Sequence, residues 1–292
     1  PVPAVVFPRI FPGAGTGAPS SVAIPYAVRG DLRNPFSMQY TFTIEHQRWR
    51  NGFRASYVGT NTRQGQWGYD ANQPVADTRL FFDKAASRPF PNYPGIGYIS
   101  NGAGHQYHGL TLSATRQMAH GLQYQFSYEF ARDIGDLERG QFPEYAYDRR
   151  RERGVWLDVP KHRITSNFLY ELPFGRGRAL PVGGPKVLNW LAGGWELSGM
   201  YTLYSGQFLT PTWTGPDPVG IAYTTSRTPA IVTLRPDHLR NANLPAGERS
   251  IDRWYDVGAF GPLQPGRLGS AARGVIVGPG QWVLHGGIAK AF

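Results

Sequence analysis

The sequence predicts an all-β fold, because apolar and polar residues alternate along four segments of the chain. Within 122–132, for example, Tyr124, Phe126 and Tyr128 are separated by Gln125 and Ser127. Since a strand sends successive side chains to opposite faces, each segment is a ribbon with one aromatic face and one polar face. The residues expected on one continuous apolar face are Phe36, Met38, Tyr40, Phe42, Ile44, Tyr124, Phe126, Tyr128, Phe168, Tyr170, Trp195 and Tyr201.

Strands of about ten residues with this pattern are typical of outer-membrane β-barrels, in which one face meets lipid and the other meets water. A soluble β-sandwich is the alternative, although its strands are usually shorter and carry fewer aromatic residues. The 37 glycines and 25 prolines in 292 residues favour strands, turns and loops over helices. No segment approaches the run of about 18 apolar residues that marks a membrane helix. We therefore predict an antiparallel up-and-down meander of outer-membrane β-barrel type.

The connections between the predicted strands alternate in length. Connectors 48–52 and 118–120 are short, whereas 63–104, 133–161 and 206–280 are long and 174–193 is intermediate. Outer-membrane barrels have short periplasmic turns and long extracellular loops, so we expect the long loops on one side. The predicted strands are about 36–47, 53–62, 105–117, 121–132, 162–173, 194–205 and 281–292.

Two regions fall outside this strand pattern. Residues 1–35 form a Pro/Gly-rich arm, and residues 36–292 form the barrel-type domain, with a long loop insertion at 206–280. The insertion is too long for a structureless connection, so it should carry its own packing. Its candidate anchors are Trp213, Trp254, Tyr255 and Phe260.

The predicted sheet leaves two open edges. About seven strands put the two ends on opposite sides, whereas a bacterial single-chain barrel has an even strand number and both ends in the periplasm. Unpaired edge groups are not tolerated in lipid and invite aggregation in water. We expect an apolar, proline-broken segment of the arm to dock on a neighbouring copy, with packing on its own chain as the alternative. The residues of this assembly arm are Val2, Val5, Val6, Phe7, Ile10 and Phe11.

The sequence carries no recognisable catalytic or metal-binding motif. It lacks a G-x-S-x-G elbow and an H-E-x-x-H helix, and its Gly13–Gly17 run is not followed by G-K-[ST]. Asp133, Asp136 and Glu138 do not have the spacing of a calcium loop, and a strand-exit turn is favoured. We predict no enzymatic activity, no cofactor and no metal.

One basic cluster, 148–153, stands out in a chain with a net charge of +10. Such a loop could bind lipopolysaccharide phosphates, nucleic acid or an acidic polysaccharide. No nucleic-acid-binding motif accompanies it, so a solvated, partly self-paired loop is favoured and no nucleic-acid partner is expected.

The chain contains a series of distinctive blocks: QYTFTIEHQ, ASYVGT, RPFPNYPGI, YHGLTLSATRQMAHGLQYQFSYEFARDIGD, KHRITSNFLYELPFGRGR, GGWELSGMYTLYSGQFLTP, SIDRWYDVGAF and GRLGSAARGVIVGPGQWVLHGGIAKAF. These blocks resemble the barrel of Oar-like TonB-dependent receptors, which carry a carboxypeptidase-regulatory-like domain before their plug. The resemblance covers about residue 30 to the end. It implies descent from a barrel of about 22 strands, with the long stretches outside the cell. The plug and the Ton box of these receptors have no counterpart in the sequence. In the last predicted strand, Lys290 is a charged residue on the side that otherwise carries apolar residues.

Two functions follow as hypotheses. In the first, the chain is a non-enzymatic structural subunit that self-assembles, with filaments as one outcome. In the second, it is a fragment of a TonB-dependent receptor that imports a bulky nutrient. The two chain ends, on opposite sides of the sheet, and the missing plug favour the structural subunit. The blocks that resemble TonB-dependent receptors favour descent from such a receptor. Expected partners are copies of the chain and outer-membrane lipid or lipopolysaccharide. The expected location is the outer membrane or the extracellular surface of a Gram-negative-type bacterium.

Overall fold

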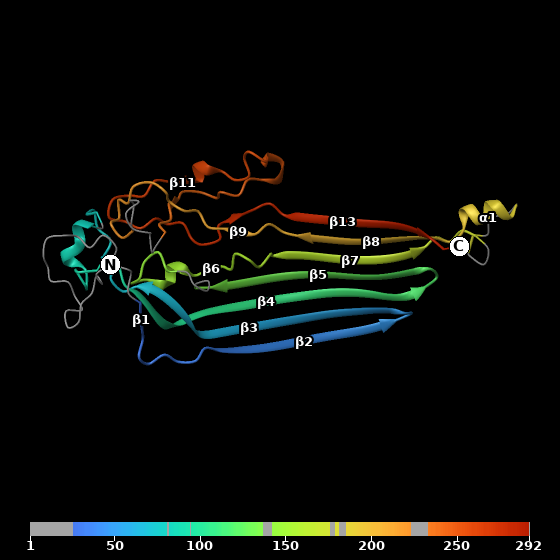
Figure 1. The fold of residues 1–292 in the computed structure, drawn as a ribbon, viewed down its shortest axis with the longest axis horizontal. Coiled ribbons are helices and arrows are strands. Elements are labelled where there is room, and N and C mark those ends of the chain that lie inside the picture. The colour runs from blue at the N-terminus through green and yellow to red at the C-terminus, as the bar shows by residue number, and fades with distance from the viewer. Residues whose placement is uncertain are drawn as a thin grey trace, which may run out of the picture.

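Seven long strands form one open antiparallel sheet (Figure 1). The computed structural model describes residues 26–80, 82–93, 95–136, 142–175, 179–180, 185–222 and 233–291. The strands lie side by side in chain order, which confirms the predicted up-and-down meander. Among the described residues, neither edge strand of this sheet pairs with a second neighbour. The strands are β2 (Phe36–Arg48), β3 (Asn51–Asp70), β4 (Gly97–Ala119), β5 (Leu122–Gly135), β7 (His162–Glu171), β8 (Trp195–Tyr204) and β13 (Gln281–Lys290).

The predicted bounds of the second and third long strands are wrong. β3 has 20 residues and β4 has 23, so the connector expected at 63–104 shrinks to 71–96. Their pairing continues past an irregularity between Thr62 and Gly65, where the register shifts. Backbone hydrogen bonds extend this ribbon beyond the part where side chains alternate in polarity. The pattern on which the prediction rested therefore ends before the strands do.

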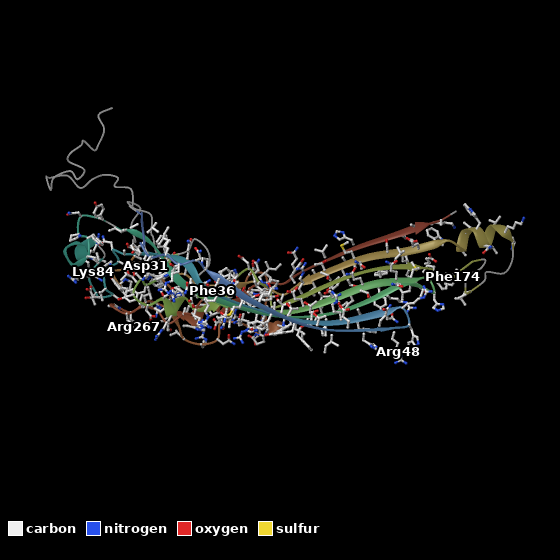
Figure 2. All side chains as sticks on the ribbon, turned by 90° about the horizontal axis from the view of Figure 1, so that it is seen from below. Asp31, Phe36, Arg48, Lys84, Phe174 and Arg267 are labelled. Atoms are coloured by element: carbon white, nitrogen blue, oxygen red, sulfur yellow. The ribbon has the colours of Figure 1, made fainter. Side chains whose placement is uncertain are left out.

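The short turns lie at one end of the sheet. Both central residues have positive φ in each turn: 47° and 64° at Trp49 and Arg50, and 53° and 77° at His120 and Gly121. This is the backbone of a type I′ turn, which matches the twist of paired strands. The helix α1 (Lys186–Ala192) lies at the same end (Figure 1). Figure 2 shows Arg48 and Phe174 at this end and Lys84 and Arg267 at the other.

The long connections gather at the opposite end as a folded unit, which we call the loop cap (the described residues of 71–96, 136–161 and 205–280) (Figure 1). Near it, β1 (Tyr26–Val28) pairs in parallel with the start of β4. The other short elements are η1 (Phe82–Ser87), η2 (Arg149–Glu152), β6 (Gly154–Val155), β9 (Phe208–Leu209), β10 (Asp237–His238), η3 (Ala246–Glu248), η4 (Val257–Ala259), β11 (Phe260–Gly261) and β12 (Ile276–Val277).

The buried apolar clusters lie in the loop cap. One contains Val219, Ile221, Ala222, Leu234 and Leu263, and a second contains Ala242, Ala259 and Ile276. The expected anchors fit this packing: Trp213 packs on the first cluster, and Tyr255 and Phe260 pack on the second. Trp254 donates its Nε1–H to the Val277 carbonyl at 2.8 Å. The cap is therefore a packed domain rather than a set of free loops.

Candidate functional site

The strand register places the predicted apolar residues on one face of the sheet. Directly paired residues of an antiparallel ladder point to the same side, and the ladder can be followed from strand to strand. Phe42 pairs with Tyr57, Tyr57 with Leu110, and Leu110 with Phe130. Followed in this way, the twelve residues expected on the apolar face share one surface. The same surface also carries Phe53, Leu112, Ile164, Leu197, Leu203, Trp282, Leu284 and Ile288.

The opposite face is polar and is tied together by its own side chains. Thr43 and Ser56 share a hydrogen bond of 2.9 Å between their hydroxyls. Arg54 and Glu45 form an ion pair of 2.6 Å between Nη2 and Oε1. The polar residues on this face also include Thr111, Gln125, Ser127, Thr165, Asn167 and Ser198. A surface of hydroxyl, amide and charged groups suits water, whereas the apolar face suits lipid.

The apolar residues form a band that crosses the strands obliquely. A row of paired residues runs from Ile44 on β2 to Trp282 on β13 and serves as a reference level. On β2 the band extends from this row toward the loop cap, as far as Phe36. On β13 it extends toward the short turns, as far as Ile288. The centre of the band thus shifts by about seven residues over six strand steps, slightly more than one residue per strand.

This shift has the size expected for a barrel wall in a bilayer. Barrel strands are tilted by about 40° from the membrane normal, lie about 4.8 Å apart and rise about 3.3 Å per residue. The segment of each strand that lies inside the bilayer is therefore displaced along the strand by about 1.2 residues relative to that of its neighbour. The observed shift of the apolar band, slightly more than one residue per strand, therefore matches the shift calculated for tilted strands in a bilayer.

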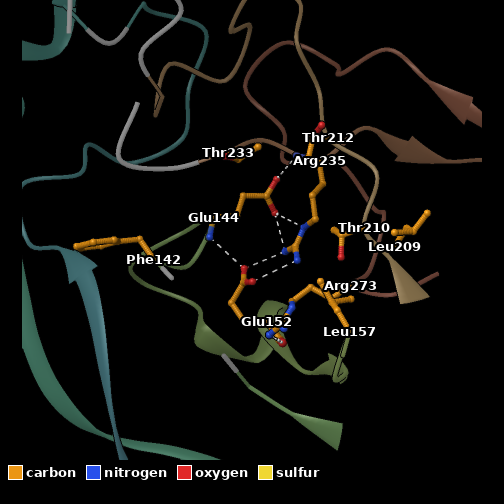
Figure 3. A pocket seen from close by; sticks show the side chains of 10 residues that line it. All are labelled: Phe142, Glu144, Glu152, Leu157, Leu209, Thr210, Thr212, Thr233, Arg235 and Arg273. Carbon is orange, nitrogen blue, oxygen red and sulfur yellow. Dashed lines mark hydrogen bonds and ion pairs between the residues drawn. The ribbon is translucent and has the colours of Figure 1, made fainter. Parts of the chain in front are cut away.

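A cavity of about 570 Å³ opens in the loop cap (Figure 3). Phe142, Leu157 and Leu209 give it apolar walls. Its hydroxyl groups come from Thr210, Thr212 and Thr233, and its charged groups from Glu144, Glu152, Arg235 and Arg273. It lies between the 142–157 segment and the 206–280 insertion, which are far apart in the sequence.

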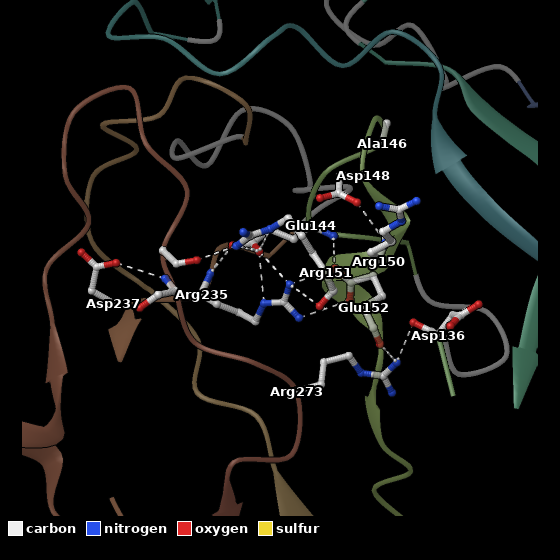
Figure 4. A network of polar contacts seen from close by, with 12 residues as sticks. Asp136, Glu144, Ala146, Asp148, Arg150, Arg151, Glu152, Arg235, Asp237 and Arg273 are labelled. Atoms are coloured by element: carbon white, nitrogen blue, oxygen red, sulfur yellow. Dashed lines mark hydrogen bonds and ion pairs between the residues drawn. The ribbon is translucent and has the colours of Figure 1, made fainter. Parts of the chain in front are cut away.

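Buried ion pairs form one wall of this cavity (Figures 3 and 4). Arg235 Nη2 lies 2.8 Å from Glu144 Oε2 and 3.0 Å from Glu152 Oε1, with all three side chains at most 6% exposed. Arg151 Nη2 reaches Glu144 Oε2 at 3.0 Å. Arg273 donates to the carbonyls of Asp136 and Glu152. Because buried charges are stable only when paired, this network fixes the two loop segments against each other.

The prediction of a solvated, partly self-paired loop at 148–153 holds only in part: Asp148, Arg150 and Arg153 are exposed, but the segment is tied into the ion-pair network of the cap. Glu152 is buried, and Asp148 accepts a hydrogen bond from the Arg150 backbone as the cap of η2. Arg149 and Arg153 lie 3.5 and 3.6 Å from the carboxylate oxygens of Asp136. Three arginines of the cluster are thus neutralised by Asp136 and Glu144 of the same connection, whereas Glu152 is paired with Arg235, more than 80 residues away. Local spacing gave no sign of the contact with Arg235.

Asp136 is thus engaged by arginines rather than set up as a metal ligand, and Asp133 lies within β5. Glu138 falls outside the described residues. Within the described part of the chain, no group of three His, Cys, Asp or Glu side chains is placed to hold a metal ion. Among the same residues, no helix has the length and apolarity needed to cross a membrane.

A second cavity, of about 560 Å³, lies where the polar face meets the loop cap. Arg163, Tyr204 and Gln281 contribute to it from β7, β8 and β13. The Arg163 guanidinium lies 5.3 Å from the centre of the Tyr204 ring. Leu209 lines both this cavity and the first one, so the two hollows share a wall residue.

A buried lysine joins two further parts of the loop cap. The Lys84 side chain is 1% exposed, and its Nζ lies 3.0 Å from Asp77 Oδ1. It also donates to the Val75 and Val219 carbonyls at 2.8 and 3.1 Å. The Arg79 guanidinium, and then the Lys84 ammonium, hold the pKa of the Asp77 carboxyl well below its usual range. The predicted assembly arm, from Val2 to Phe11, lies outside the described residues.

Comparison with known proteins identifies the family. The model of the "Outer membrane beta barrel domain" family matches residues 1–292. Among curated proteins and among solved structures, nothing matches the chain. Together with the open meander and its two chemically distinct faces, the family match means that this chain belongs to the outer membrane beta barrel domain family, whose place is the outer membrane of Gram-negative-type bacteria.

Proposed function

We propose that the chain forms part of the wall of a large outer-membrane barrel of the TonB-dependent receptor type. In this proposal the apolar face lies against lipid and the polar face lines a water-filled lumen. The loop cap lies outside the cell, where it captures a bulky polar solute for import. The chain itself performs no chemical reaction on that solute.

The oblique apolar band carries this proposal. If the apolar face packed against another protein, its apolar residues would not need to shift regularly from one strand to the next. A bilayer imposes such a shift on every barrel wall, because barrel strands are tilted by about 35–45°. The band therefore favours lipid over neighbouring subunits as the cover of the apolar face.

The two cavities support the proposed solute. Arg235 and Arg151 together balance the carboxylates of Glu144 and Glu152, and Arg273 donates to two backbone carbonyls. The larger cavity therefore offers mainly threonine hydroxyls and apolar walls. Such a lining suits a polar, uncharged molecule with an apolar side. The other cavity shares a wall residue with it and lies where the polar face meets the loop cap, on the side from which a solute would enter the lumen.

Self-assembly is the second candidate, and the edges of β2 and β13, which pair with no second strand among the described residues, favour it. Unpaired strand edges must be covered in a membrane, either by further strands of one barrel or by other copies of this chain. In the second case, the β13 edge of one copy would pair with the β2 edge of the next.

The mass and shape of the native particle distinguish the two candidates. The protein is extracted from outer membranes and imaged by electron microscopy with and without detergent. A receptor wall predicts a detergent-dependent particle with a single ring and a lumen. Rings or fibres of many copies that persist without detergent would support self-assembly, and a water-soluble monomer would contradict both.

A further inference from the structure

The helix α1 presents an apolar surface that stays largely exposed in the part of the chain that the structure describes. None of its residues is buried, and Val187, Leu188, Trp190 and Leu191 are 50–63% exposed. At about 100° of rotation per residue, these four side chains share one side of the helix, and Asn189 lies on the other. This surface needs a cover, since a clustered apolar patch in water is unfavourable.

Lys290 attaches this helix to the end of the apolar face. Lys290 is the last residue of β13 and pairs with Trp195, so its side chain lies on the apolar side of the sheet. Its Nζ donates to the carbonyls of Trp190 and Leu191 at the end of α1, at 2.9 Å in the second case. The same ammonium lies 4.9 Å from the ring centres of Trp190 and Trp195. The apolar surface of α1 is therefore continuous with the apolar face, beyond the last band residue of β13.

The same end of the sheet is rich in cations and tryptophan. In the β2–β3 turn, the Arg48 guanidinium lies 3.8 Å from the centre of the Trp49 ring, and Trp49 is 76% exposed. Arg50 follows, and Lys186 begins α1. Tryptophan rings lie at the level of lipid headgroups, and the long stems of lysine and arginine cover apolar surface while their charges reach the headgroups. This chemistry is that of a membrane interface.

We infer that α1 is an interfacial helix that binds the anionic phospholipid headgroups of the leaflet at the short-turn end. Its apolar side enters the boundary between headgroups and acyl chains, as amphipathic helices do. Lys186 and the arginines of the β2–β3 turn supply positive charge for the phosphates, while Lys290 holds the helix in place. The inference rests on the proposed lipid contact of the apolar face, with which α1 is continuous.

A depth measurement tests this inference on the full chain. Because the protein contains no cysteine, single-cysteine variants can carry a fluorophore without background. Val187→Cys and Leu191→Cys report on α1, Leu112→Cys on the centre of the apolar band, and Thr111→Cys on the polar face. Each labelled variant is folded into phosphatidylcholine vesicles with phosphatidylglycerol. Quenching is compared among lipids spin-labelled at a shallow position, lipids spin-labelled at a deep position, and aqueous iodide.

We expect shallow lipid quenching at both α1 positions, deep lipid quenching at Leu112→Cys, and iodide quenching alone at Thr111→Cys. Iodide quenching alone on α1, with deep quenching retained at Leu112→Cys, would overturn the interfacial helix and leave the barrel wall intact. Loss of lipid quenching at Leu112→Cys would instead overturn the proposed function.

The headgroup charge is tested with the same probes. Omitting phosphatidylglycerol, or replacing the tether by Lys290→Met, should reduce shallow quenching at Val187→Cys and leave Leu112→Cys unchanged. Shallow quenching that does not depend on phosphatidylglycerol would overturn the anionic headgroup as the partner.

Discussion

The sheet and the loop cap are built by different rules, although one chain forms both. In the cap, Val219 and Ile221 are at most 1% exposed and pack in a cluster, as in a soluble domain. On the apolar face of the sheet, Phe126 is 38% exposed and Phe42 is 65% exposed. The strands are held by their backbone ladders, and their apolar side chains are left for the surroundings to cover. The position of a residue, rather than its type, therefore decides what a substitution costs.

The largest effect is expected in the buried ion pairs of the cap. Arg235→Met removes the shared cation of Glu144 and Glu152, and an uncompensated buried charge typically costs about 3–5 kcal/mol. Urea unfolding, followed by the fluorescence of the cap tryptophans, measures the loss. As a control, Arg240→Met removes an exposed partner of Asp256 and should cost about 0–1 kcal/mol. Equal losses in the two variants would show that the network does not hold the cap together.

A matched pair of truncations compares the two regions directly. Ile221→Ala empties a site in the cap core and should cost about 2–5 kcal/mol. Ile44→Ala on the apolar face should cost clearly less, because a 59% exposed side chain leaves no enclosed cavity. Unfolding in vesicles, monitored separately for cap and sheet, gives both values. A larger loss at Ile44 than at Ile221 would reverse the proposed distinction.

A charge introduced on the strands should distinguish the two faces. Phe126→Lys places an ammonium near the centre of the apolar band, at a cost of about 2–4 kcal/mol for a lipid-facing site at the bilayer midplane. Gln125→Lys, one residue away on the polar face, should be nearly neutral. Folding yield in vesicles at increasing urea compares the two. Similar yields would mean that the apolar face does not meet lipid.

A smaller effect is expected in the tight turn before β5. Gly121 has φ of +77°, and an added Cβ would lie 2.8 Å from the Glu171 carbonyl oxygen. Gly121→Ala should therefore cost about 1 kcal/mol or more. Gly247→Ala in the cap, where nothing lies within 4 Å of the added Cβ, serves as the control. Thermal unfolding of both variants checks the prediction, which a neutral Gly121→Ala would refute.

The smallest effect is a pH dependence confined to the cap. Since Arg79 and Lys84 lower the pKa of Asp77, its ionised form stabilises the cap at pH values above about 4, the pKa in the unfolded chain. That stabilisation is lost as the pH falls further, toward the lowered pKa of the folded state. The protection of the backbone amides of residues 75–80 against hydrogen exchange, relative to the intrinsic exchange rate at each pH, should therefore fall on acidification in the native protein, and less so in Asp77→Asn. An identical response in the two proteins would exclude this role.

The sequence predicted the sheet better than the cap. Alternation identified four of the seven long strands and the side to which Tyr124, Phe126 and Tyr128 point, because that information is local. The turn at Trp49 and Arg50 lacks the Asn-Gly pair that usually marks a type I′ turn, so turn chemistry could not refine the strand ends. The ion pair between Arg235 and Glu144 joins residues that are 91 positions apart in the sequence, and no local pattern can reveal such a contact. α1 was predicted only as a connector, although its run of Val187, Leu188, Trp190 and Leu191 after Lys186 was a signal of an amphipathic segment.

The central claim is that the sheet separates lipid from water, and a cysteine scan of β5 tests it most directly. Each residue from Leu122 to Phe130 is replaced in turn by cysteine in the otherwise cysteine-free chain, folded into vesicles and exposed to a water-soluble maleimide. We predict strict alternation: Gln123, Gln125, Ser127 and Glu129 positions react quickly, and the even-numbered positions react slowly. Uniform reactivity along the strand would contradict the account.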